Sequence, residues 1–205
     1  MLKIYSLIFF AAMLVLGSAN AQAQTSGSSN PPFNKVLMMD FEKGMAGDKA
    51  LFDSAMGRTE AILAQNPNDA RALAWHGSGT LYRLGMHERN KSKAESEATM
   101  KKGIKEMDDA VSAAPEDVLV LVVRAATLTS VAKHSPSSDE SARLLTAGIG
   151  DFEKIARLTE TKTDGESKGL RIYALKTLIQ YYEKKGDAEK ANAYKKLLPA
   201  IPVKK

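Results

Sequence analysis

The stretch WHGSGTLYRLG, residues 75–85, decides the fold of this chain. Gly79 follows Trp75 by four residues, so the two lie on one face of a helix. A small residue on such a face lets a second helix approach closely, while large side chains such as Trp75 and Tyr82 fill the space beside it. The stretch therefore predicts a helix packed tightly on another helix, with Trp75 and Tyr82 in the core rather than at a ligand site.

The helical period continues from residue 33 onward, where glycine and proline are sparse and apolar residues recur at spacings of three and four. Residues 118–123, VLVLVV, have the β-branched composition of a buried strand. A lone strand would find no partner here, and the pattern runs on without a turn signal as far as Leu128. We therefore predict a helix that is apolar nearly all round, and an all-α fold.

Helix boundaries follow from capping and breaking residues. Two pairs fit the capping box, in which each side chain satisfies a free backbone N–H: Ser92 with Glu95, and Ser137 with Glu140. Breakers or polar turns stand at residues 44–48, 66–69, 161–165 and 186–187, and at Pro115, Pro199 and Pro202. These boundaries predict eight helices arranged as four hairpins.

The stretch around Trp75 resembles the first-helix signature W-x-x-L-G-x-x-Y of the tetratricopeptide repeat family, with Ser78 where leucine is usual. Gly103, Met107, Ala110 and Pro115 resemble the second-helix part of the same repeat. Residues 86–93 insert between the two halves and lengthen the hairpin loop.

Two other hairpins repeat parts of the pattern, around Ala55 and Ile62 and again around Tyr182 and Tyr194, while residues 118–158 match it least. The resemblance covers residues 33–202. It implies a right-handed α-solenoid of about four hairpins, in which the first helix of each hairpin lines a concave groove.

The N-terminus has the pattern of a secretory signal. Lys3 precedes an apolar run over residues 4–16, shorter than a bilayer-spanning helix, and two small-residue cleavage sites follow. We expect a signal peptide at residues 1–23, a flexible leader at 24–32, the helical domain at 33–202 and a basic tail at 203–205. This organisation predicts export to the periplasm and no stable membrane insertion of the mature chain. The absence of cysteine leaves the core alone to stabilise the fold.

Composition and motifs argue against catalysis, metal binding and nucleic-acid binding. The net charge is +5, but the charges are mixed in sign and no basic stripe with interleaved aromatics occurs. His76, His87 and His134 lack the spacing of metal ligands, and no nucleophile with a base, or glycine loop for phosphate, is recognisable. We expect no enzyme activity, no catalytic residues, no metal and no cofactor.

The resemblance places the predicted partner-binding residues on the concave face of the first helices, beside the core positions. His76, for example, would turn away from the core because Trp75 turns in. The candidates are His76, Thr80, Arg83, Val122, Thr129, Tyr173, Lys176 and Gln180. They lack the lysine and asparagine clamp for a peptide carboxylate. We expect a protein or peptide partner; the alternative is an apolar small molecule or lipid, bound by a module associated with a transport system.

Overall fold

The computed structural model describes residues 33–86, 92–135 and 137–198. These residues form eight α-helices and no strand, which confirms the all-α prediction. The predicted signal peptide, the predicted leader and the basic tail all lie outside the described residues. The helices are α2 (Lys35–Met45), α3 (Lys49–Gln65), α4 (Ala70–Met86), α5 (Lys93–Ala113), α6 (Val118–Ala132), α7 (Ser138–Leu158), α8 (Gly165–Lys184) and α9 (Ala188–Leu197).

Side-chain caps explain where the helices begin. An Asn, Asp or Ser side chain accepts a backbone N–H in the first turn of each described helix. The capping box of Ser92 and Glu95 is confirmed in full. At Ser137 only half of the expected box forms, because the Glu140 carboxylate accepts hydrogen bonds from Arg143 instead.

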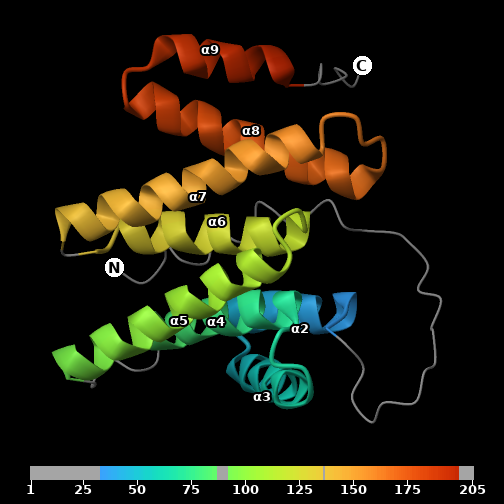
Figure 1. Ribbon diagram of the computed structural model, residues 1–205, viewed down its shortest axis with the longest axis vertical. Helices are drawn as coiled ribbons and strands as arrows, with labels where there is room; N and C mark the ends of the chain where they lie inside the picture. The colour runs from blue at the N-terminus through green and yellow to red at the C-terminus, as the bar shows by residue number, and fades with distance from the viewer. Residues whose placement is uncertain (1–32, 87–91, 136, 199–205) are drawn as a thin grey trace.

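Residues 118–123 belong to α6, so the helix prediction for this apolar segment is confirmed. The helix can be apolar nearly all round because it lies in the middle of the molecule, between α4 and α5 on one side and α7 on the other (Figure 1). Ten of its fifteen residues are buried. None of the helices in the described residues is both long and apolar enough to cross a membrane.

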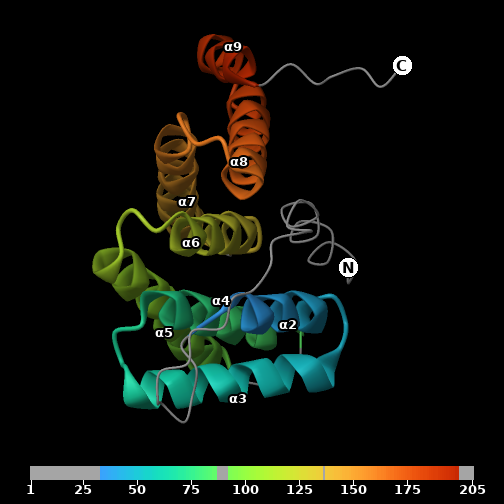
Figure 2. The same ribbon diagram turned by 90° about the vertical axis from the view of Figure 1, so that its right-hand side faces the viewer.

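Consecutive helices pack as pairs, α2 with α3, α4 with α5, α6 with α7 and α8 with α9. The pairs follow one another along the long axis, from α2 and α3 at one end to α9 at the other (Figures 1 and 2). The first helices of neighbouring pairs also touch, α2 with α4 and α4 with α6. A buried hydrogen bond of 2.8 Å joins Ser78 on α4 to Thr127 on α6.

Aromatic side chains form the core between the first two helix pairs. The Trp75 ring lies 5.4 Å from that of Phe41 and 6.1 Å from that of Phe33, between ring centroids. The Tyr82 ring stands 5.0 Å from Phe52, and its hydroxyl donates to the carbonyl of Met45 at 2.9 Å. Trp75 is only 1% exposed. Both residues therefore pack in or against the core, as the sequence predicts.

An ion triad fixes the middle of the molecule. Arg124 on α6 donates to both carboxylate oxygens of Asp151 on α7, at 2.7 and 2.8 Å, and to Asp108 on α5 at 2.9 Å. Asp151 is buried, and desolvation raises its pKa although Arg124 opposes the shift. The triad thus ties the α6 and α7 pair to the preceding one.

Candidate functional site

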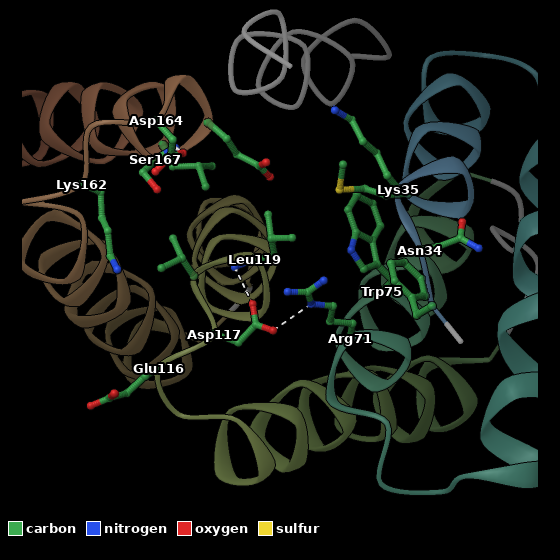
Figure 3. A pocket seen from close by; sticks show the side chains of 15 residues that line it. Asn34, Lys35, Arg71, Trp75, Glu116, Asp117, Leu119, Lys162, Asp164 and Ser167 are labelled. Atoms are coloured by element: carbon green, nitrogen blue, oxygen red, sulfur yellow. Dashed lines mark hydrogen bonds and ion pairs between the residues drawn. The ribbon is translucent and has the colours of Figure 1, made fainter. Parts of the chain in front are cut away.

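A cavity of about 630 Å³ opens where the N-terminal ends of the first helices converge (Figure 3). Each of the four helix pairs contributes to its wall through α2, α4, α6 or α8, or through the residues just before them. The lining residues are Phe33, Asn34, Lys35, Met38, Arg71, Trp75, Glu116, Asp117, Val118, Leu119, Lys162, Asp164, Glu166, Ser167 and Leu170. The start of α6 lies at the centre of this cavity, with α2 and α4 on one side and α8 on the other (Figure 3).

The apolar part of the wall belongs to the core. Phe33 and Trp75 are stacked, and Met38 is buried beside them on α2. Leu119 on α6 packs against the same core cluster, which also contains Leu170 of α8. The floor of the cavity is therefore continuous with the hydrophobic core.

The rim carries charges of both signs. Arg71 reaches from α4 to Asp117, and its Nε donates to the carboxylate at 2.8 Å (Figure 3). Asp117 also caps α6. Asp164 caps α8, and hydrogen bonds from the backbone and side chain of Ser167 lower the pKa of its carboxyl group. Side chains at two helix starts are thus held by their capping bonds.

A second, smaller cavity of about 40 Å³ lies beside the Ser78–Thr127 hydrogen bond. It is lined by Met45, Ser78, Leu81, Tyr82, Thr127, Ser130 and Val131, from α2, α4 and α6. The two cavities therefore flank the contact between the first helices.

Glu42 occupies the stretch of α2 between the two cavities. Its neighbours on the same helix face, Met38 four residues before and Met45 three residues after, line the larger and the smaller cavity respectively. The Oε1 atom of Glu42 is buried and has no hydrogen-bond partner among the described residues. Burial raises the pKa of this carboxyl from 4.5 to about 7, with Lys35 opposing the shift.

His76 lies elsewhere than expected. It is only 7% exposed, and its Nδ1 atom lies 2.7 Å from Oε2 of Glu106 on α5. Its Nε2 atom lies 3.6 Å from the carboxylate of Glu60 on α3. The expectation that His76 turns away from the core is wrong, because α3 and α5 cover the face of α4 next to Trp75.

The other predicted residues also lie outside the larger cavity. Val122 is 3% exposed and Thr129 is 9% exposed, so they are packing residues in α6. Tyr173 packs edge-on against Phe152, and burial raises the pKa of its hydroxyl to about 12. The accessible candidates are Lys176 and Gln180, which are exposed, and Thr80 and Arg83, which are half-buried.

Arg83 contacts α3. Its guanidinium lies 3.7 Å from Asp53 and 5.7 Å from the centroid of the Phe52 ring, both on α3. The structure thus brings none of the eight predicted residues to the wall of the larger cavity.

A sequence signal for the larger cavity did exist. If the first helices of successive hairpins start at one edge, the capping residues before them gather there. Asn34, Asp117 and Asp164 are such caps, and all three line the cavity. The prediction from the sequence placed the groove on the helix faces instead.

No three His, Asp or Glu side chains within the described ranges are placed to hold a metal ion. Comparison of the chain with protein-family models, curated proteins and solved structures gives no match. A functional assignment therefore depends on the geometry of the chain itself.

Proposed function

We propose that this protein is an exported, non-catalytic scaffold of tetratricopeptide-like hairpins that binds a protein or peptide partner in its groove. The observation that carries the proposal is the cavity of about 630 Å³, to which all four helix pairs contribute. The resemblance of residues 75–85 and 103–115 to one complete repeat supports the hairpin assignment. The signal-like residues 1–23 support export to the periplasm.

Close helix contacts at glycine support the same assignment. A Cβ on Gly79 would clash with the sulfur of Met56 on α3 and would lie 3.1 Å from the ring of Phe41 on α2. The glycine of the repeat signature is therefore the residue that lets α4 lie against the first helix pair. This is the scaffold role that the family signature implies for the position.

The chemistry of the cavity favours a peptide over a lipid. Ligand sites typically enclose about 300–1,000 Å³, and this cavity falls within that range. Its rim of lysine, arginine, aspartate and glutamate matches the mixed polarity of a polypeptide. The more apolar space beside Ser78 measures only about 40 Å³, which is far too small for an acyl chain.

Partner capture by cavity variants tests the proposal. Leu119→Lys places a charge in the cavity wall, and Val36→Lys places the same charge on an exposed apolar residue of α2 outside the lining. We expect tagged wild-type protein and Val36→Lys to enrich the same partner from periplasmic extract, and Leu119→Lys to lose it, with all three equally folded by circular dichroism. Equal capture by Leu119→Lys would contradict the proposal. Native mass spectrometry that shows a bound lipid instead would favour the small-ligand alternative.

A further inference from the structure

The basic charge of the chain is concentrated at its C-terminal end. Residues 33–164 contain eighteen Lys or Arg and twenty Asp or Glu, so their charges nearly cancel. Residues 165–205 contain ten Lys or Arg and only four Asp or Glu. The positive net charge therefore belongs to α8, α9 and the tail, and these two helices form one end of the molecule (Figures 1 and 2). Charge of one sign at one end of a protein favours a partner of the opposite sign.

Three exposed lysines of the last helix pair make no ion pair within the described residues. They are Lys176 and Lys184 on α8 and Lys196 on α9. An ion pair of 2.6 Å crosses between the two helices, from Lys195 to Glu183, the sequence neighbours of Lys196 and Lys184. Lys176 lies two helical turns before Glu183 and so shares its face of α8. The three lysines therefore flank one contact between α8 and α9, and together we call them the basic surface.

The basic surface lies apart from the two cavities. The part of α8 that lines the larger cavity extends only to Leu170, and none of the three lysines lines either cavity. Lys176 was expected in the partner-binding groove, but its exposed position on α8 places it on this second surface. A partner on the basic surface would thus leave the larger cavity open.

The tyrosine rings near the basic surface are already engaged. Tyr182 is 7% exposed, and Tyr194 stacks on it with a hydroxyl that donates to Glu153 at 3.0 Å. The ammonium group of Lys185 lies over the ring of Tyr181, 5.3 Å from its centroid. Proteins that bind single-stranded nucleic acid combine a basic groove with aromatic rings on which the bases stack. A nucleic acid is therefore disfavoured as the anionic partner.

An exposed apolar side chain favours a lipid surface instead. Leu197 follows Lys196 directly and is 43% exposed, one of three exposed large apolar side chains among the described residues. The sequence then continues to IPVKK, residues 201–205, which again combines apolar residues with lysines. This combination is typical of segments that lie on anionic bilayers, where ammonium groups meet lipid phosphates and apolar side chains enter the headgroup boundary.

We propose that α8 and α9 dock the protein on the surface of a bilayer that contains anionic phospholipids. The ammonium groups of the basic surface pair with the lipid phosphates, and Leu197 enters the headgroup region. The contact is peripheral and reversible, because no helix of the described residues can span a membrane and each lysine contributes only a small factor. The proposal goes beyond the partner-binding function, since it holds the scaffold at a membrane with its cavity free.

Vesicle sedimentation with two matched triple variants tests the proposal. The first variant removes the basic surface: Lys176→Gln, Lys184→Gln and Lys196→Gln. The second removes three exposed lysines on or next to α2, α5 and α6 that likewise make no ion pair within the described residues: Lys43→Gln, Lys101→Gln and Lys133→Gln. Each protein is mixed with vesicles of phosphatidylcholine alone, or of phosphatidylcholine with phosphatidylglycerol, and its folding is checked by circular dichroism.

We expect wild type and the second variant to bind the phosphatidylglycerol vesicles alike, and neither to bind phosphatidylcholine alone. The first variant is expected to bind about a hundredfold more weakly, because each lysine close to an anionic bilayer contributes about fivefold. Leu197→Ser is expected to weaken binding as well, since it removes the apolar contact. Salt at about 1 M is expected to release the bound protein by screening the charges.

Several outcomes would overturn the docking surface. Equal loss in the two triple variants would show that net charge alone attracts the protein. Failure of wild type to bind phosphatidylglycerol vesicles, or binding to neutral vesicles that every variant retains, would also contradict it. A single-stranded oligonucleotide that binds through the three lysines, without any vesicle binding, would reassign the surface to nucleic acid. The cavity variant Leu119→Lys is expected to keep wild-type vesicle binding, so failure of docking and failure of partner capture are distinguishable.

Discussion

Gly77 on α4 and Gly103 on α5 face each other backbone to backbone. A Cβ on Gly77 would lie 2.5 Å from the carbonyl oxygen of Gly103, and a Cβ on Gly103 would lie 2.9 Å from that of Gly77. A backbone atom cannot move aside as the end of a flexible side chain can. The mutual contact therefore fixes how closely α4 and α5 approach each other.

Gly77→Ala is expected to destabilise the protein by about 1 to 3 kcal/mol, because the cost of overpacking exceeds the gain of about 1 kcal/mol in helix propensity. Gly57→Ala in α3 is the matched control, since a Cβ there meets nothing within 4 Å. It is expected to stabilise the fold by about 0.5 to 1 kcal/mol. Urea unfolding followed by circular dichroism measures both. Stabilisation by Gly77→Ala would show that the helices can separate without cost.

Ser78 is the departure from the family signature, and its hydroxyl is 2.8 Å from that of Thr127 in the buried contact between α4 and α6. Ser78→Ala or Thr127→Val alone leaves one hydroxyl without this partner and is expected to cost about 1 to 2 kcal/mol. The double variant removes both hydroxyls and is expected to cost less than the sum of the two. A double-mutant cycle measures the coupling, expected to be about 1 kcal/mol. Strict additivity would mean that the bond does not join the pairs energetically.

Much of the fold could be predicted from local sequence. The caps at Asp48, Ser92 and Asp187 follow from residue type and spacing, and α6 follows from the uninterrupted run after residue 118. These features depend on neighbours within about four residues, which is the range over which periodicity is informative.

The site could not be predicted in the same way, because it depends on which helices cover which faces. His76 lies beside Trp75 in sequence, but its partner Glu106 is thirty residues away on α5. Periodicity placed His76 next to the core face and could not show that α3 and α5 cover that position. Nor could it reveal that the N-terminal ends of the first helices surround a cavity, which depends on how the helix pairs pack on one another.

The burial of His76 changes the expected effect of its replacement. His76→Ala removes the 2.7 Å contact to Glu106 and is expected to cost about 2 kcal/mol, rather than the near-neutral effect of an exposed site. Lys176→Ala, at an exposed position of α8, is expected to change stability by less than about 0.5 kcal/mol. Thermal unfolding of both variants at the same pH tests these two expectations. Equal melting temperatures would contradict the burial of His76.

Glu42 gives stability a pH dependence whose sign follows from the direction of its shift. In the unfolded chain the carboxyl titrates near 4.5, whereas in the folded chain burial raises its pKa to about 7. Between these values the folded protein retains a proton that the unfolded chain has lost, so the free energy of unfolding decreases as pH rises through this window. Above about pH 7 both states are ionised and the loss is complete.

Glu42→Gln removes this titration while keeping the size of the side chain. After discounting for the partial solvent exposure of Glu42, we expect the variant to be about 1 to 2 kcal/mol more stable than wild type at pH 8 and nearly equal to it at pH 4.5. Glu97→Gln on the exposed face of α5 is expected to show no such difference between the two pH values. Urea unfolding at both pH values gives the comparison. An equal effect of Glu42→Gln at pH 4.5 and pH 8 would mean that the Glu42 carboxylate is solvated in the folded protein.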